Sequence, residues 1–492
     1  MARRMENGDV GIAAVTPDRA PASLAPTHCA ADDARSADLL WRLGNVPFSR
    51  WHTKARIVMG SATFFDAFDA LALAFILPVL IGLWHLNSTQ IGALIASGYL
   101  GQVIGALLFG WFAEKYGRVR SASTTIALMS VMGLVCAFTG SFNTLFICRF
   151  IQGIGVGGEV PVAAAYINEL SNARGRGRFF MLYELIFPVG LLAAAQIGAF
   201  VVPRFGWQTM FFIGGVPGLL IVWAISRLPE SPRWLIARGR YDEAERIIER
   251  IEFSTPLRNA PADTAANSAV YGEIVESLAA QRRADSLRKS RWTELFSPFY
   301  RSRTLIVWML WATSYFVANG LNNWLPSLYK TVYHMGLQES LRTASLSNVL
   351  STCLAVVCAL CIDKVGRRNW ATGTFVIAGC LLGALWLHGA QTAGALMLFG
   401  SSAYGFIGTT TVLLYLYTPE VYPTRMRAVG TALATSWLRL ASAAGPAVVG
   451  VVLGSHGIGA VFLLFAVVCA IGAIAATRMI ETRERSLEEL AP

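Results

Sequence analysis

The sequence predicts an all-α membrane protein in which twelve transmembrane helices form two pseudo-symmetric halves of six. Three observations predict this fold class. Only 14% of the 492 residues are charged, whereas soluble domains have about 25% charged residues. Twelve apolar runs are long enough to cross a bilayer, which takes about 20 residues of helix. Two loop motifs recur at nearly the same distance along the chain, which indicates that one half is a copy of the other.

The apolar runs form two sets that are separated by a polar stretch. The first set predicts helices over residues 57–83, 91–113, 121–139, 144–170, 179–202 and 207–226. The second set predicts helices over residues 303–329, 341–361, 370–388, 393–418, 426–452 and 457–478. We therefore expect a disordered tail over 1–50, an N-terminal half over 51–226, a linker with short helices over 227–302, a C-terminal half over 303–480 and a second tail over 481–492.

Lys and Arg are concentrated in alternate loops, which indicates how the chain is oriented in the membrane. The loops after the second, fourth, eighth and tenth runs are rich in Lys or Arg, whereas residues 140–143 and 389–392 contain neither. Because basic residues stay on the cytoplasmic side, we expect cytoplasmic termini and a location in the inner cell membrane. Orientation then explains the net charge of +11, and we expect no nucleic-acid partner.

No residue pattern points to a cofactor, a metal or an enzyme. Cys358 and Cys361 have C-x-x-C spacing, but no His or further Cys supports a metal site with them, so they favour helix packing. The glycines between Gly153 and Gly158 lie inside an apolar run with no strand before it, which favours close helix contact over nucleotide binding. We therefore expect no cofactor, no metal and no enzymatic activity.

Two charged motifs occur once in each half. EKYGRVR begins at Glu114, and DKVGRRN begins 249 residues later at Asp363. A Glu and an Arg seven positions apart follow the fourth run, from Glu169, and recur 251 residues later after the tenth run. Matched acidic and basic partners predict one charge network per half at the cytoplasmic helix ends, although the cations could instead only fix the topology. The expected network residues are Glu114, Arg118, Arg120, Glu169 and Arg176 in the first half, and Asp363, Arg367, Arg368, Glu420 and Arg427 in the second.

These motifs resemble those of major facilitator transporters. RFIQGIGVGGEVPVAAAYINE (149–169), PESPRWL (229–235) and PEVYPTRMRAVGT (419–431) are similar to the sugar porters and related branches. FFDAFD (64–69) resembles the bacterial metabolite–proton symporters, which include niacin and aromatic-acid carriers and are related to organic ion transporters and synaptic-vesicle transporter-like proteins. The resemblance covers residues 50–480. It implies alternating access between two halves, with the charge networks closing the inside in the outward-facing state.

Four charged residues within the apolar runs are candidates for proton coupling, because ionisable groups at bilayer depth are costly and usually functional. Asp66 and Asp69 share one face of the first helix, where two carboxylates disfavour each other's ionised form. Arg149 matches an arginine that pairs with a first-helix acid in the resembling sugar porters. Glu159 lies ten residues further on and is turned by about 80°, so it would bind a proton or substrate, or pair locally.

Arg439, at mid-depth in the eleventh run, is the most informative residue for the charge of a substrate. A guanidinium in a cavity is a bidentate receptor for a carboxylate. The related organic anion transporters have an arginine at this place and the cation transporters an aspartate, so the resemblance implies an anionic substrate. Alternatively, Arg439 neutralises Glu159, Glu184 or the first-helix acids. Glu184 itself lies where sugar porters often present a glutamine to the substrate.

The seventh run argues against a sugar. Sugar porters typically read Q-Q-x-x-G-x-N there, whereas this chain reads FVANGLN from residue 316, which keeps the asparagine and loses both glutamines. A sugar needs many polar partners, since a buried hydroxyl left unpaired costs about 1–3 kcal/mol. An aromatic substrate needs ring faces and few polar groups. The further substrate-binding candidates are Phe68, Tyr315, Phe316, Asn319, Asn322, Asn323, Tyr404, Tyr415 and Trp437.

The resemblance and these residues together predict a secondary transporter that imports a small aromatic carboxylate, such as nicotinate, by proton symport. Its partners would be the substrate, protons and the lipid bilayer, and we expect a monomer. Three alternatives stay open: a sugar or polyol carrier, favoured by PESPRWL; an organic cation carrier, favoured by the buried acids; and a non-transporting sensor with the same fold, against which the paired motifs argue.

Overall fold

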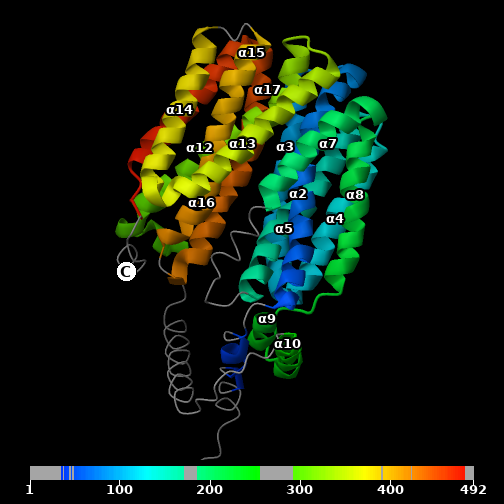
Figure 1. The fold of residues 1–492 in the computed structure, drawn as a ribbon, viewed down its shortest axis with the longest axis vertical. Helices are drawn as coiled ribbons and strands as arrows, with labels where there is room; N and C mark the ends of the chain where they lie inside the picture. The colour runs from blue at the N-terminus through cyan, green and yellow to red at the C-terminus, as the bar shows by residue number, and fades with distance from the viewer. Residues whose placement is uncertain are drawn as a thin grey trace, which may run out of the picture.

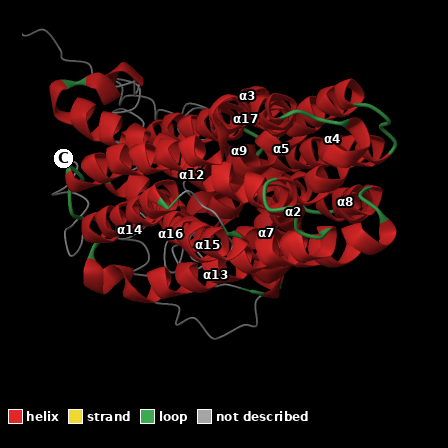
Figure 2. Cartoon of the chain, turned by 90° about the horizontal axis from the view of Figure 1, so that it is seen from above, coloured by secondary structure: helices red, strands yellow, loops and turns green. Residues whose placement is uncertain are grey.

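The structure is a computed structural model that describes residues 35–36, 38–43, 46, 49–170, 186–254, 292–388, 392–422 and 424–482. Every regular element in these ranges is helical, and Figure 2 shows a bundle of helices joined by short loops.

Two sets of long helices make up the bundle. The first set is α2 (Arg50–Trp84), α3 (Ser88–Tyr116), α4 (Arg118–Ala137), α5 (Phe142–Leu170), α7 (Ile186–Phe205) and α8 (Gln208–Ser226). The second set is α12 (Pro298–Thr331), α13 (Leu337–Val365), α14 (Arg367–Leu387), α16 (Ser401–Glu420) and α17 (Thr424–Thr477), with α15 (Ala393–Ala395) and the π-helical turn η2 (Leu396–Gly400) leading into α16. Three short helices, α9 (Pro232–Ala237), α10 (Tyr241–Phe253) and η1 (Trp292–Phe296), come between the sets.

The predicted twelve-span helical fold is confirmed. In the described ranges, eleven helices are long and apolar enough to cross a membrane. The last of them, α17, contains Gly457 in a non-helical conformation with φ of 77°. Glycine adopts positive φ without steric cost, so the chain bends here and α17 supplies two spans. The two helices predicted over 426–452 and 457–478 therefore follow each other without a loop.

Two helices begin earlier than their apolar runs. The first was predicted from residue 57 and the seventh from residue 303, but α2 starts at Arg50 and α12 at Pro298. The N–H of Ser49 donates to Nδ1 of His52 (3.2 Å) at the start of α2, which satisfies a backbone group at the helix end. Polar residues thus extend these helices beyond the apolar stretch that hydropathy detects.

The two sets of helices stand side by side (Figure 1), with α2 to α8 on one side and α12 to α17 on the other. We call the end of the bundle that carries Gly117 and Gly366 the motif end. The opposite end, which carries Asn87 and Ser141, is the far end. Helices α9 and α10 lie beyond the motif end, next to the first set (Figure 1).

Residues 38–43, expected to belong to a disordered tail, are helical and pack on α10. Leu39 and Leu43 are buried in a small apolar cluster with Ile248 of α10. Arg42 Nη2 also lies 2.7 Å from Glu252 Oε2. The expectation of disorder over 1–50 needs correction here, because the apolar face of this segment has a partner. Helix α10 is one of the short helices expected within the linker over 227–302.

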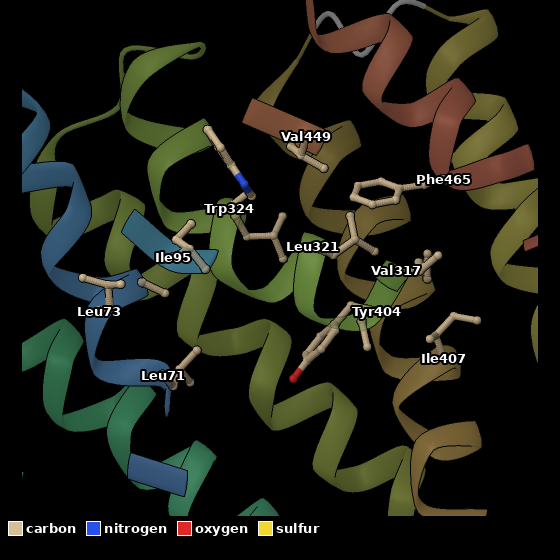
Figure 3. Packing of buried hydrophobic residues seen from close by; sticks show 14 of the residues in the cluster. Leu71, Leu73, Ile95, Val317, Leu321, Trp324, Tyr404, Ile407, Val449 and Phe465 are labelled. Carbon is tan, nitrogen blue, oxygen red and sulfur yellow. The ribbon is translucent and has the colours of Figure 1, made fainter. Parts of the chain in front are cut away.

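The apolar core is shared between the two sets toward the far end. Leu73 of α2 and Ile95 of α3 belong to the same buried cluster as Leu321 and Trp324 of α12, as Figure 3 shows. Toward the motif end, the first set has a cluster of its own around Met59, and none of its described members comes from the second set. The described conformation therefore holds the two sets together at the far end.

Glycines allow this far-end contact. A Cβ atom on Gly92 of α3 would lie 2.6 Å from the carbonyl oxygen of Pro446 in α17, and one on Gly450 would meet the carbonyl oxygen of Ser88. Real Cβ atoms do not approach backbone so closely, so any larger residue would push the helices apart.

We expect Gly92→Val to open the far end. Forcing a side chain into this contact costs about 1–3 kcal/mol, which shifts the balance away from the described conformation. Labelling by a polar maleimide of a cysteine introduced at Ile91, which is buried, should rise. Gly82→Val is the matched control, since a Cβ there meets nothing within 4 Å. Equal labelling in both variants would contradict the role of this contact.

Candidate functional site

A buried ion pair joins α2 and α5. Arg149 Nη1 lies 3.0 Å from Asp69 Oδ2 and donates to Gln152 Oε1 at 2.9 Å. Gln152 Nε2 donates to Asp69 Oδ1 at 2.8 Å. Asp69, Arg149 and Gln152 are 7%, 6% and 1% exposed. Both oxygens of Asp69 are therefore bonded, and such additional hydrogen bonds are what an ion pair needs in order to be tolerated in an apolar interior.

Sequence reasoning expected Arg149 to meet Asp66 or Asp69, and the structure places it against Asp69. It missed Gln152. The signal was present, because Gln152 is three residues after Arg149 and shares its helix face.

Asp66 and Glu159 form a second acidic cluster, and Asp66 lies about one helical turn nearer the motif end than Asp69. Thr63 of α2 donates through Oγ1 to Glu159 Oε1 of α5 at 3.0 Å. Asp66 is on the same face of α2 as Thr63, since the two are three residues apart. Glu159 is fully buried and Asp66 is 3% exposed. Within the described ranges, Asp66 Oδ1 is buried without a hydrogen-bond partner, a costly arrangement unless a proton or ligand completes it.

Arg439 of α17 reaches from the second set of helices to the first. Its Nη2 donates to the carbonyl oxygen of Gly157 in α5 at 3.3 Å, and Nη1 donates to that of Thr435 at 3.5 Å. It interacts electrostatically with Asp66, yet no described carboxylate forms an ion pair with it. Of its two expected roles, direct neutralisation by Asp66, Asp69 or Glu159 is therefore not seen in this conformation.

Aromatic rings of α12 and α16 lie next to Arg439. Tyr315 and Tyr415 both interact electrostatically with its guanidinium. Trp311 stacks on Tyr315, with ring centroids 5.5 Å apart at 12°, and meets Tyr415 edge-on at 4.8 Å. Trp311 is fully buried, and its Nε1 donates to Thr418 Oγ1 at 2.9 Å. Sequence reasoning missed Trp311, which positions both tyrosines.

A chain of polar side chains continues toward the far end along α12. Asn319 donates to Ser442 Oγ at 2.7 Å. Asn323 donates to Tyr99 Oη of α3 at 3.3 Å and so links the two sets of helices.

Asn322 and Tyr404 are linked by one further residue, Asn348. Asn348 of α13 donates to Asn322 Oδ1 at 3.3 Å and accepts from Tyr404 Oη at 3.2 Å. Sequence reasoning missed Tyr99, Asn348 and Ser442, because single uncharged polar residues do not stand out in apolar runs.

Three aromatic candidates lie outside this cluster, and we remove them from the site. Phe68 is fully buried against α8 at Gly214, Phe316 faces Phe465 with ring centroids 6.2 Å apart, and Trp437 packs on Trp308. These three residues lie at the depth of the site along their helices, but their side chains are turned away from it. Residues one or two positions from Tyr315, Asp66 or Arg439 are turned by about 100–200° on a helix.

Two expected networks occupy the motif end. In the first, Arg118 Nη2 lies 2.9 Å from both Glu114 Oε1 and Glu169 Oε1. In the second, Arg367 lies 3.6 Å from Glu420 Oε1. Four further expectations fall outside what the structure describes: Glu184 and Arg176 lie in an undescribed segment, and the side chains of Asp363 and Arg427 are not described. Arg120 and Arg368 are exposed.

Two carboxylates that sequence reasoning missed cap the helices at this end. Glu230 accepts hydrogen bonds from the N–H groups of Arg118 (2.9 Å) and Val119 (3.2 Å) at the start of α4. Glu481 accepts from the N–H groups of Arg367 (2.9 Å) and Arg368 (3.1 Å) at the start of α14. Glu230 and Glu481 are 251 residues apart, which is the offset of Glu169 and Glu420 and could have revealed a third repeated motif.

Burial raises the pKa of the Glu230 carboxyl above its ordinary value, since desolvation outweighs the amide bonds and Arg118, which favour the charged form. A carboxyl whose pKa is raised in the folded state makes its full contribution to stability below the unfolded Glu pKa of about 4.3. It loses this contribution as the pH rises through its pKa in the folded state. The melting-temperature advantage of the wild type over Glu230→Gln should therefore shrink as pH rises from about 4.3 toward neutrality. Thermal unfolding over this range measures it, with the partly exposed Glu243→Gln as control. A pH-independent difference would contradict it.

The comparisons with known proteins now decide the family. Residues 49–492 match the family model described as sugar (and other) transporter. The chain belongs to this family. As a member, it is 33% identical over 460 residues to the niacin transporter NiaP of Acinetobacter baylyi, which covers 92% of this chain and 99% of the relative. It is 27% identical over 461 residues to the organic cation/carnitine transporter 7 of Arabidopsis thaliana, covering 86% and 90%.

The fold of this transporter is that of the major facilitator superfamily. The inward-open structure of the xylose transporter XylE from E. coli superposes with a TM-score of 0.70 at 20% identity, covering 89% of this chain and 99% of that one. The expected resemblance to major facilitator transporters is therefore confirmed, and the protein is an integral membrane transporter for small molecules.

Proposed function

We propose that this transporter moves nicotinate, or a similar small aromatic monocarboxylate, across a cell membrane in symport with a proton. The observation that carries the proposal is Arg439, a guanidinium at the interface of the two sets of helices whose hydrogen bonds to the described residues are two long ones to carbonyl oxygens. Such a group favours a carboxylate ligand. The similarity to a niacin transporter supports the aromatic acid.

The proposed binding mode uses the groups around Arg439. The carboxylate binds the guanidinium, and the ring lies against Tyr315 and Tyr415, since aromatic substrates favour ring faces. The coupled proton binds Asp66 or Glu159, which are buried and close to a second carboxylate. An anion and a proton together carry no net charge, so their joint entry limits the electrostatic cost of occupying a buried site.

The proposed cycle is alternating access, with the motif end in the cytoplasm, where basic loops are retained. The shared core and the glycine contacts close the far end, so we infer that the described conformation opens to the cytoplasm. In the opposite conformation, the networks around Arg118 and Arg367 would hold the cytoplasmic ends together. A single exposed pair contributes about 0–1 kcal/mol, so only the whole network biases the two states.

A sugar or polyol is the second candidate, because the amide groups of Asn319, Asn322, Asn323 and Asn348 form a polar chain along the bundle. These groups bond to one another or to hydroxyls of the protein, which leaves fewer of them for a sugar.

Uptake of labelled nicotinate into proteoliposomes tests the proposal. We expect uptake to be stimulated by an inward proton gradient, and to be inhibited by unlabelled nicotinate but not by xylose or tetraethylammonium. Empty liposomes are the control. Absence of uptake with or without the gradient would overturn the substrate, and uptake that ignores the gradient would overturn the coupling.

A further inference from the structure

Two groups of opposite charge in the site have hydrogen-bonding capacity that the described residues do not use. Arg439 is partly buried and has five N–H donors, and its two bonds to described residues are long ones to carbonyl oxygens. Asp66 is 3% exposed, and its Oδ1 has no partner in the described part of the chain. Buried polar groups normally have partners, so Asp66 points to a ligand, and Arg439 supplies free donors for the same ligand.

The two groups approach the same segment of α5 from different helices. Arg439 bonds to the carbonyl oxygen of Gly157. Asp66 shares a face of α2 with Thr63, which bonds to Glu159, two residues further along α5. Arg439 and Asp66 interact electrostatically, but they form no ion pair within 4.0 Å. The two groups are therefore close enough to act on each other but do not bond directly, and a small molecule with complementary polar groups would complete both.

Of the two acids nearest to Asp66, Asp69 is excluded as a ligand contact by its own bonds, and Glu159 has one oxygen already bonded. Asp69 has both oxygens bonded, to Arg149 and Gln152. Glu159 Oε1 accepts from Thr63. Besides Arg439, the charged or titratable groups that act on Asp66 are Glu159 and Asp69, and Asp66 in turn acts on Tyr99.

We propose that Asp66 hydrogen-bonds to the ring nitrogen of the substrate, which in nicotinate is meta to the carboxylate, so that the transporter selects this pyridine carboxylate over benzoate. The inference rests on the proposed function, since it assumes that Arg439 holds the carboxylate. One shared proton suffices for the bond. A neutral Asp66 donates its O–H to a pyridine nitrogen, and an ionised Asp66 accepts from a pyridinium N–H. The coupled proton and the selectivity then depend on the same contact.

The test compares nicotinate, benzoate and picolinate as ligands of the purified protein in nanodiscs. A site built to hydrogen-bond a polar atom rejects an analogue that lacks it, because its own buried group is left unpaired. The wild type should bind benzoate at least about tenfold more weakly than nicotinate. Picolinate, whose nitrogen is adjacent to the carboxylate, should bind as weakly as benzoate. In Asp66→Ala the three affinities should become equal, because nicotinate loses its hydrogen bond and benzoate no longer leaves a buried carboxyl unpaired; measurable benzoate binding then shows that the variant is folded.

A conservative variant separates recognition of the ring nitrogen from the titration of Asp66. Asp66→Asn keeps a donor for the ring nitrogen but does not titrate, so it should retain the preference for nicotinate and lose stimulation by a proton gradient. If Asp66→Asn is folded and has no preference, or if Asp66→Ala keeps the wild-type ratio, the inference is wrong. Equal binding of benzoate and nicotinate by the wild type overturns it and leaves the proposed function intact, whereas no binding of any aromatic acid overturns the proposed function itself.

Discussion

Arg439→Ala should reduce nicotinate uptake by at least about 30-fold, because truncating one partner of a buried, hydrogen-bonded charge pair costs about 2–5 kcal/mol. Arg439 has no carboxylate ion-pair partner among the described residues, so its removal leaves none of the described acids newly unpaired. The loss should therefore fall on the substrate and not on the fold. Initial uptake rates and the concentration dependence of binding measure the effect.

Two comparisons make this result specific. Arg439→Lys keeps the charge but cannot form a bidentate contact, so its rate of nicotinate uptake should lie between those of the wild type and Arg439→Ala. Arg204→Ala removes an exposed arginine from α7 and should leave uptake unchanged. Nicotinate affinity that survives Arg439→Ala would show that the carboxylate binds elsewhere.

Arg149→Ala should produce the largest loss of stability. Removing one member of a buried pair leaves an uncompensated charge and costs about 3–5 kcal/mol. Here the remaining charge would be Asp69, which is 7% exposed and would keep only its bond from Gln152. The melting temperature in detergent should fall sharply, and uptake should be lost with it.

The double variant Arg149→Ala with Asp69→Asn tests whether the loss comes from the unpaired charge. It should recover much of the stability of Arg149→Ala, because no buried ion remains. Arg240→Ala, which breaks an exposed pair with Glu243, is the control and should cost at most about 1 kcal/mol. Additive losses in the double variant would show that Arg149 and Asp69 are not coupled.

The sequence predicts most of the fold, because apolar runs and basic loops are direct consequences of the bilayer as solvent. It predicts the positions of charged residues such as Arg149 and Asp69 for the same reason, since each is an exception within an apolar run. It does not predict which ring faces the site. Phe68, Phe316 and Trp437 share the depth of the site, but their direction depends on how each helix is rotated against its neighbours. Gln152 and Trp311 escape notice because neither carries a charge.

Glu230 and Glu481 have a consequence for how the molecule can move. Each follows the sixth span of its own half and returns to the start of that half's third span, so each half is fastened to itself and not to the other. When one half tilts against the other, the hydrogen bonds of Glu230 and Glu481 do not have to break. Among the described residues, the resistance to tilting then comes from the packing and hydrogen bonds across the interface between the halves, and each half can move as a rigid unit about the far-end contact.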